Sequence, residues 1–367
     1  QQSPMTGDAE RESRRRRADC LAAAGRGAAA AEEYLRAAGG AAAAEALQLR
    51  RNAATQFLTS GHVDEGLETL RTVLAAVGMK LPKTRRRAVL ALWLRRLQVR
   101  LRGVEFRERD SSQMPPKDLW RIDICWSATL GLSMVDSVTA AAFQARHLLL
   151  ALRAGEPYRI SRALALEAVH VAIAGGRAGH RAERYLEQAM ALARRVDDPH
   201  ALGVVSMASG IVAWLKGRWA RAVELADEAE TTFRESCTGV AWELEAARAC
   251  AFWALCACGA VDELSHRLPL ALPDGEEGRD STVGDRTSDM VTLPRLAAND
   301  PDGAERELGD EADECWEDRV PVKRFHRLLA HVQIALSRGD GRRARDRIMD
   351  VWRSLNRSYL WRVQLLR

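Results

Sequence analysis

The feature that most constrains this chain is a turn residue that recurs at a nearly constant spacing in its second half. Gly176, Gly217, Gly259, Asn299 and Gly339 are separated by 41, 42, 40 and 40 residues. Glycine and asparagine readily adopt the left-handed backbone conformation that ends a helix. A fixed period of this size, with helical sequence on both sides of each turn, is typical of an array of helical hairpins.

The clearest hairpin spans residues 206–233, where two antiparallel helices are expected to meet at Gly217. The second helix has one apolar face, formed by Trp219, Ala222, Val223, Ala226, Ala229 and Phe233. Small residues recur where two helix backbones would approach each other, as in tetratricopeptide (TPR) repeats, and Gly61 marks an earlier unit of the same kind. We therefore predict an all-α, TPR-like α-solenoid of helical hairpins with a period of about 40 residues.

The repeat region is expected to occupy residues 42–367. Residues 1–41 are first polar and then rich in Ala, with several Gly, which predicts a partly disordered linker. Residues 273–293 are polar and rich in Gly, so one repeat is expected to be weak or irregular there. Because the chain begins without Met and stops inside an apolar helical pattern, we expect a fragment of a longer protein.

Composition limits the class of protein. Hydrophobic residues make up 47% of the 367 residues, which is enough to build a substantial core. The seven Cys are scattered and include no CxxC pair, so we interpret them as reduced thiols packed as small hydrophobic side chains. We find no signal peptide and no uncharged run as long as a membrane span. The sequence therefore predicts a cytoplasmic protein without a membrane segment.

The sequence contains none of the common nucleotide-binding or catalytic motifs. It has no GxxxxGK[ST] loop, no kinase catalytic loop, no HExxH and no GxSxG. His326 and His331 are five residues apart, which is poor spacing for metal ligands on a helix, and His147 and His170 fit helix packing better than base catalysis. We therefore predict a chain that is not an enzyme, with no catalytic residue and no bound cofactor or metal.

Charged residues are unevenly distributed, although the formal net charge is only +5. Residues 83–109 contain ten Lys and Arg against two Glu, whereas residues 262–318 contain eighteen Asp and Glu against five Arg. The simplest interpretation is that these are solvated faces of opposite sign.

The basic segment includes a predicted helix over residues 84–102. One narrow apolar stripe, expected to be buried against protein, is formed by Leu90, Leu94, Leu97 and Leu101. The arginines off that stripe predict a basic outer face, which could dock an acidic surface through Arg95, Arg96 and Arg100. Contact with nucleic acid or an anionic membrane is the weakest alternative, because the net charge is modest and no DNA-reading motif is present.

Three segments carry a resemblance to a known family: 121–136 (RIDICWSATLGLSMVD), 142–167 (AFQARHLLLALRAGEPYRISRALALE) and 235–247 (ESCTGVAWELEAA). They resemble the C-terminal helical region of large bacterial proteins that carry a serine/threonine protein kinase domain and an AAA-type ATPase module. The resemblance extends from about Ala42 to Arg367. It implies a non-catalytic sensor or scaffold region that binds a protein, a peptide or a small effector in a helical groove. The kinase and ATPase modules of the same polypeptide would then be its partners.

Two other functions stay open at this point. The chain could be the helical sensor arm of an ATPase-linked transcription activator, or a free-standing TPR adaptor. A kinase domain before Gln1 would favour the first interpretation, and a helix-turn-helix domain after Arg367 would favour the transcription activator.

Overall fold

The computed structural model describes residues 7–133, 135–173, 178–271, 290–309 and 322–357. Within these ranges the chain forms seventeen α-helices and one short 3₁₀ helix, and it forms no β-strand. The all-α fold class that the sequence predicts is therefore confirmed. None of the helices in the described ranges is long and apolar enough to cross a membrane.

The chain divides into two compact units. The first comprises residues 1–167, 188–201 and 238–241, and the second comprises residues 168–187, 202–237 and 242–367. Three helices are divided between the two units: α8 (Pro157–Ala172), α9 (Ala178–Val196) and α10 (Pro199–Leu215). A fourth, α12 (Ala241–Cys258), has only its first residue in the first unit.

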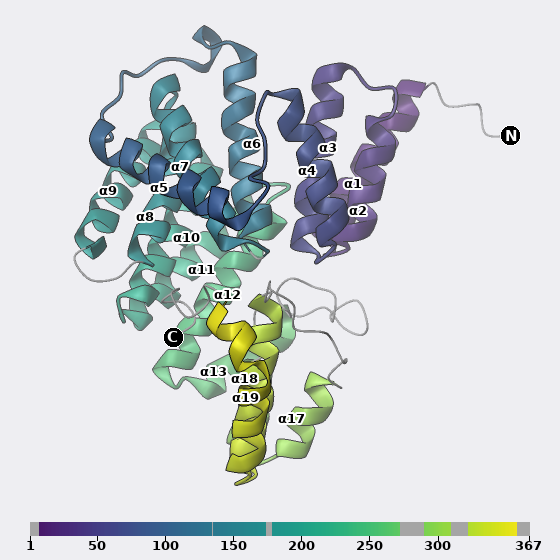
Figure 1. Cartoon of the computed structure of the whole chain (residues 1–367), viewed down its shortest axis with the longest axis vertical. Helices are drawn as coiled ribbons and strands as arrows, with labels where there is room; N and C mark the ends of the chain where they lie inside the picture. The colour runs from purple at the N-terminus through teal and green to yellow at the C-terminus, as the bar shows by residue number, and fades with distance from the viewer. Residues whose placement is uncertain (1–6, 134, 174–177, 272–289, 310–321, 358–367) are drawn as a thin grey trace, which may run out of the picture. The chain divides into compact units, whose positions relative to one another are not determined.

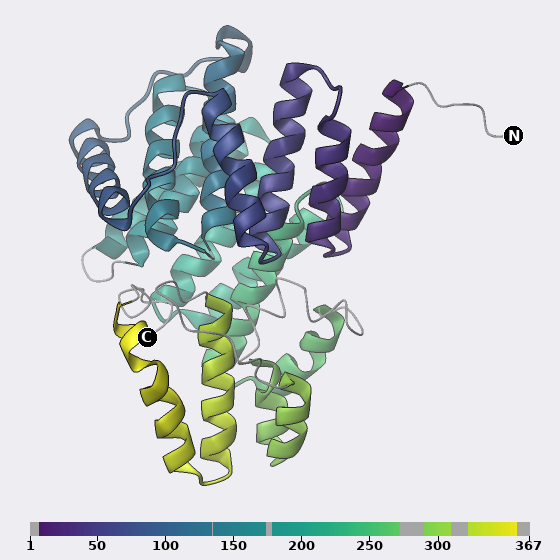
Figure 2. The same ribbon diagram turned by 45° about the vertical axis from the view of Figure 1, so that its right-hand side comes forward.

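The first unit begins with four helices that lie side by side in Figures 1 and 2: α1 (Gly7–Ala23), α2 (Gly27–Ala38), α3 (Ala43–Thr59) and α4 (Val63–Ala76). Each packs on the next one along the chain. Most of residues 1–41 therefore lie in two packed helices, which differs from the linker that the sequence predicts.

Two kinds of contact hold α1 and α2 in place. Ion pairs between residues three or four positions apart, such as Arg14 with Glu10 at 2.7 Å, stabilise the surface of α1. The hydroxyl of Tyr34 donates a hydrogen bond to the carboxylate of Asp19 at 2.6 Å and so ties α2 to α1. Alanines supply the buried side chains between these helices: Ala18, Ala30, Ala31, Ala37 and Ala38.

The first unit continues with α5 (Arg85–Arg102), the 3₁₀ helix η1 (Ser111–Gln113), α6 (Pro116–Leu132) and α7 (Ser137–Ala154). Helix α6 packs on α3, α4 and α7, and α5 packs on α7. Large apolar side chains fill the space between α3, α4, α6 and α7, among them Leu58, Leu70, Leu74, Ile124 and Phe143. This core fixes the positions of α3 and α6 relative to each other.

The second unit contains the remaining helices: α11 (Trp219–Ser236), α12 (Ala241–Cys258), α13 (Val261–Ala271), α16 (Leu293–Ala297), α17 (Pro301–Leu308), α18 (Val322–Ser337) and α19 (Gly341–Arg357). Helices α10 and α11 approach each other closely. A Cβ atom at Gly203 would lie 2.5 Å from the ring of Phe233, and one at Gly210 would lie 3.3 Å from the carbonyl oxygen of Ala222. Small residues are therefore required along this contact, as the sequence of the hairpin predicts.

The described turn residues share a left-handed backbone. Their φ angles are 85° at Gly61, 74° at Gly217, 71° at Gly259, 59° at Asn299 and 75° at Gly339. The residue five positions after each of these turns is buried: Gly66, Ala222, Leu264, Ala304 and Ala344. A helix therefore begins at a constant number of residues after each turn residue, and the same position of each of these helices is buried.

Two sequence predictions fall on parts of the chain that the structure does not describe. Gly176, the first turn of the predicted period, lies outside the described residues. So do residues 273–289 of the predicted weak repeat, after which Leu293 begins α16.

Helix α5 has the opposite orientation from the one that the sequence predicts. The predicted buried stripe is exposed, with 39–79% of the surface of each residue accessible to solvent at Leu90, Leu94, Leu97 and Leu101. The expectation of a buried leucine stripe is therefore wrong. The small residues Ala88 and Val99 are buried instead.

The reason for this orientation is a buried carboxylate on α8. Glu167 is buried, and the guanidinium of Arg96 forms an ion pair with it. Arg102 donates a second anchoring hydrogen bond to the carbonyl oxygen of Leu152 at 3.1 Å. Because an unpaired buried carboxylate is costly, the face of α5 that carries Arg96 turns toward the protein, and the four leucines of the predicted stripe face solvent.

Candidate functional site

A cavity of about 550 Å³ lies in the first unit, between α3, η1, α6 and α8. Helix α3 contributes Leu47 and Arg51, α6 contributes Trp120 and Asp123, and α8 contributes Arg159. Ser111 and Ser112 of η1 also line the cavity. The cavity is lined by apolar and polar residues in equal number, and apolar walls with a few well-placed polar groups are typical of sites that bind small molecules.

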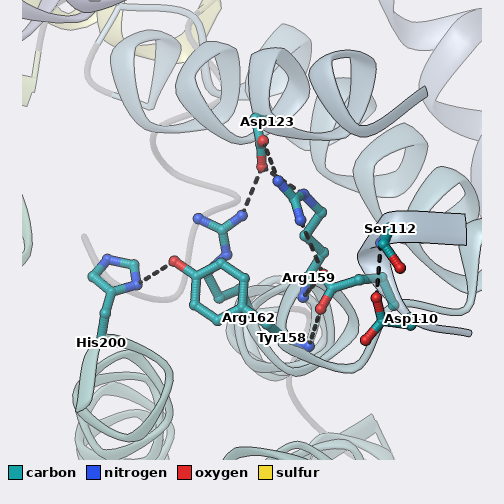
Figure 3. A network of polar contacts seen from close by, with 8 residues as sticks. Asp110, Ser112, Asp123, Tyr158, Arg159, Arg162 and His200 are labelled. Atoms are coloured by element: carbon teal, nitrogen blue, oxygen red, sulfur yellow. Dashed lines mark hydrogen bonds and ion pairs between the residues drawn. The ribbon is translucent and has the colours of Figure 1, made fainter. Parts of the chain in front are cut away.

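Asp123 is the centre of a polar network beside this cavity (Figure 3). Arg159 donates to it through Nε at 3.0 Å and Nη2 at 2.7 Å, and Arg162 donates through Nη2 at 2.9 Å. Burial alone would raise the pKa of Asp123. The hydrogen bonds from Arg159 and the charges of Arg162, Arg159 and Arg51 outweigh it and lower that pKa below its ordinary value. Asp123 is therefore ionised at neutral pH.

The first turn of α8 is organised by Glu156, which precedes the helix. Its carboxylate accepts the backbone N–H of Tyr158 at 3.1 Å and of Arg159 at 3.0 Å, as a capping residue does. The same carboxylate accepts a hydrogen bond from Nη1 of Arg159 at 3.1 Å. Arg159 is therefore held by two carboxylates at once. At the right of Figure 3, Asp110 accepts the backbone N–H of Ser112 at 2.8 Å and caps η1.

Arg162 is held by aromatic rings as well as by Asp123. Its guanidinium lies over the ring of Tyr158, 4.3 Å from the centroid, and over that of Trp126 at 4.7 Å. The hydroxyl oxygen of Tyr158 is 3.0 Å from Nδ1 of His200 (Figure 3). Arg162 is therefore held within the protein by these contacts. The two arginines that line the cavity are Arg159 and Arg51.

Arg51 is the second of those arginines, and it forms no ion pair within the described part of the chain. Its Nε is buried and has no hydrogen-bond partner among the described residues. Burial lowers the pKa of Arg51; Asp123 offsets part of this effect, and the charges of Arg162 and Arg159 lower the pKa further. Both oxygens of Asp123 already accept hydrogen bonds from α8. The cavity therefore has an excess of positive charge at Arg51.

His147 of α7 lies beside the network as a neutral packing residue. It is fully buried, and its ring meets that of Trp126 edge-on with 5.8 Å between centroids. Its Nδ1 is 3.3 Å from Oε1 of Gln144. Burial, reinforced by the charge of Arg162, lowers the pKa of His147 from 6.5 to about 3.

We expect His147 to make the unfolding free energy fall by about 2 kcal/mol between pH 7 and pH 5. The unfolded chain binds a proton at this residue near pH 6.5, whereas the folded chain does so only near pH 3. Stability is therefore lost as pH falls through this window. Urea unfolding at both pH values, for wild type and for His147→Gln, measures the effect. The variant should show about 2 kcal/mol less pH dependence, whatever its stability at pH 7. Parallel pH dependence in the two proteins would contradict the assignment.

Neither Asp123 nor its arginine partners are predicted as a site from the sequence. One signal was available: Asp123 is an acidic residue flanked by Ile122 and Ile124, both of which are buried, so it required a cation nearby. The identity of that cation was not readable, because Arg159 is 36 positions away along the chain.

The arginines that the sequence proposes as a docking surface are not equivalent in the structure. Arg96 is held by Glu167, Arg95 is half-buried and donates to Oε1 of Gln98 at 3.2 Å, and Arg100 is exposed. None of the three lines the cavity. Their role in docking stays a prediction.

Comparison with known proteins yields no family assignment, since no protein-family model and no curated protein matches the chain. The geometry of the cavity and of its arginines is therefore the basis for a functional assignment.

Proposed function

We propose that this chain is a non-catalytic, TPR-like sensor or scaffold region that binds an anionic effector in the cavity between α3, η1, α6 and α8. The observation that carries the proposal is the buried Nε of Arg51, which has no hydrogen-bond partner among the described residues. A carboxylate or phosphate in the cavity would accept from Arg51 and lie close to Arg159. The wall formed by Leu47, Leu119 and Trp120 suits an apolar or aromatic body beside that anionic group.

We also propose that the hairpins form a TPR-like α-solenoid with a period of about 40 residues. The left-handed turns at Gly217, Gly259, Asn299 and Gly339, with a buried residue five positions after each, support this period. So does the consecutive packing from α1 to α4 in one unit and from α16 to α19 in the other. In a solenoid each repeat contacts only its neighbours along the chain.

Part of the proposed site lies within the segments that resemble kinase–ATPase proteins. Asp123 belongs to the segment 121–136, and Arg159 and Arg162 belong to the segment 142–167. We propose that an effector in the cavity favours one arrangement of the helices and thereby biases attached kinase and ATPase modules. Under this proposal the chain senses, and the chemistry belongs to those modules.

Isothermal titration calorimetry with two anionic probes tests the binding proposal. The probes are acetyl-Leu-Phe with a free carboxylate and phenyl phosphate, compared with acetyl-Leu-Phe amide and phenol. We expect each anion to bind at least about tenfold more tightly than its neutral analogue, because a hydrogen bond to a charged group contributes about 1.5–3 kcal/mol. If neither anion binds, or if the neutral analogues bind equally well, the cavity is not an anion site.

Replacing Arg51 with Gln should weaken binding of the anionic probes about tenfold or more. The same variant without ligand should be at least as stable as wild type, because the charge that it removes is partly buried and has no ion pair in the described chain. Arg50→Gln is the matched control: Arg50 is the preceding residue on α3 and is exposed, so its replacement should change neither property. Equal probe binding by the two variants would contradict the role of Arg51.

A further inference from the structure

Helix α5 carries an unusual share of the exposed apolar surface. Half of the large hydrophobic residues that are exposed in the described chain lie on this one helix, and we define them as the α5 stripe: Val89, Leu90, Trp93, Leu94, Leu97 and Leu101. Trp93 is 65% exposed and Leu101 is 79% exposed. A contiguous apolar patch of this kind marks an interaction surface rather than ordinary surface composition.

The spacing of the stripe favours a helix as its partner. Leu90, Leu94, Leu97 and Leu101 recur at alternating intervals of four and three residues, which is the spacing of the a and d positions in a coiled coil. The helix has 18 residues and is therefore about 27 Å long. A helix that lies on a lipid surface needs a broad apolar face, whereas these leucines form a narrow seam.

The arginines beside the leucine seam favour a partner helix with acidic residues. Arg86, Trp93 and Arg100 are seven residues apart, so they line one side of the seam, and both arginines are exposed. Helix α5 contains no acidic residue. A second copy of this chain would bring two arginine-flanked seams together, which like charges oppose. Glutamates on a partner helix would pair with Arg86 and Arg100 instead.

The opposite face of α5 holds the stripe in a fixed orientation. Arg96 is paired with the buried Glu167, and Arg102 donates to the carbonyl oxygen of Leu152. To turn the stripe inward, the helix would have to break the Arg96 pair and leave the Glu167 carboxylate without that cation. A partner therefore meets a helix that is already formed and oriented, which reduces the entropy cost of binding.

We propose that the α5 stripe docks an acidic amphipathic helix of another protein or module. That helix would carry Leu or Ile along one seam and Glu beside it, and it would pack along the length of α5. This surface is separate from the cavity, because no residue of α5 lines the cavity. Docking on α5 therefore does not depend on the anion-binding proposal.

Fluorescence anisotropy with the full chain and a labelled synthetic peptide tests the proposal. The probe is a peptide of heptads with Leu at a and d and Glu at e and g, and its counterpart has Lys in place of Glu. We expect the Glu peptide to bind, the Lys peptide not to bind, and added salt to weaken the complex. The double variant Leu90→Ser/Leu97→Ser should weaken binding about tenfold or more. Arg86→Gln/Arg100→Gln should weaken it mainly at low salt.

The matched control is Leu270→Ser/Leu336→Ser. These leucines lie on α13 and α18 and are 86% and 57% exposed, so the control removes similar apolar surface elsewhere. It should bind the Glu peptide as wild type does. Unchanged circular dichroism and melting temperature in both double variants would show that the fold is intact, as expected for exposed positions.

Three results would overturn the proposal. The first is a wild-type chain that does not bind the Glu peptide. The second is binding to vesicles of phosphatidylglycerol and phosphatidylcholine that Leu90→Ser/Leu97→Ser abolishes, without peptide binding, which would assign the stripe to an anionic membrane. The third is a wild-type dimer in sedimentation velocity that the same variant dissociates, which would assign the stripe to a second copy of the chain.

Discussion

Replacing Asp123 with Asn should lower the unfolding free energy by about 3 kcal/mol. The variant keeps the shape of the side chain but removes the charge that pairs with Arg159 and Arg162, which leaves Glu156 as the carboxylate paired with Arg159. Breaking a buried ion pair from one side is costly because the remaining charges stay buried without compensation. Denaturant unfolding of the wild type and the variant at neutral pH measures this loss.

Asp227→Asn is the control with the same local geometry. Asp227 accepts two hydrogen bonds from Arg267, at 2.7 and 3.1 Å, so this pair is also bidentate. Its side chains are 39% and 30% exposed, whereas those of Asp123 and Arg159 are 18% and 17% exposed. We therefore expect the control to lose less than about 1 kcal/mol. If both variants lose the same amount, burial of the Asp123 network does not matter to stability.

The effect of Asp123→Asn should also depend on pH in one direction. Because the pKa of folded Asp123 is lowered from 3.8, its contribution is present above this ordinary value and is lost as pH falls below it. The stabilities of the wild type and the variant should therefore converge at acid pH. A difference that stays constant down to pH 2 would show that the ionised form is not the stabilising one.

Arg51 should be coupled to Asp123 in a double-mutant cycle. In the Asp123→Asn background Arg51 is a cation beside two other cations, so removing it should recover part of the lost stability. The double variant Asp123→Asn/Arg51→Gln is then expected to be more stable than Asp123→Asn alone. Simple additivity of the two effects would contradict the shared electrostatic network.

Replacing Gly155 with Ala should cost about 3–5 kcal/mol. Gly155 ends α7 with a φ of 84°, and a Cβ atom at this position would overlap the backbone carbonyl oxygen of Arg107. The carbonyl oxygen of Gly155 accepts the backbone N–H of Arg109 at 2.9 Å, so the two segments are joined and cannot separate easily. The substitution would also displace Glu156, which caps α8. Thermal and denaturant unfolding both report the loss.

Gly61→Ala separates the two causes of this loss. Gly61 has the same left-handed backbone, with a φ of 85°, but in the described part of the chain no atom beyond its immediate neighbours lies within 4 Å of the position of its missing Cβ. We expect it to cost only the backbone strain, about 1 kcal/mol. Equal losses at the two glycines would mean that the contact with Arg107 is unimportant.

The sequence predicts the helical architecture well because its signals are local. A glycine or asparagine at a turn and a small or apolar residue five positions later can be read along a single helix, and the structure gives these positions left-handed and buried environments, respectively. The packing of α1 and α2 was not predicted, because most of their buried side chains are alanines, which are weak signals of burial, and because their stabilising ion pairs lie on the surface.

The orientation of α5 and the Asp123 network were not predictable for a common reason. In both cases one charged residue on an otherwise apolar face forms an ion pair with a residue that is distant along the chain. Glu167 pairs with Arg96, and Asp123 pairs with Arg159 and Arg162. Hydrophobic periodicity places the leucines of α5 inward, but a single buried carboxylate is enough to reverse that preference.

The free space around the glycine turns determines where residues can be inserted into this chain. Among the described residues, no atom outside the immediate neighbours lies within 4 Å of the position that a Cβ would occupy at Gly61, Gly217, Gly259 or Gly339. Residues inserted at these turns would therefore project into free space and leave the paired helices in register, whereas an insertion within the next five positions would rotate a buried residue out of its contact. The turns are accordingly the positions where a peptide tag or a whole additional domain can be accommodated, and each such insertion would leave the helices on both sides unchanged.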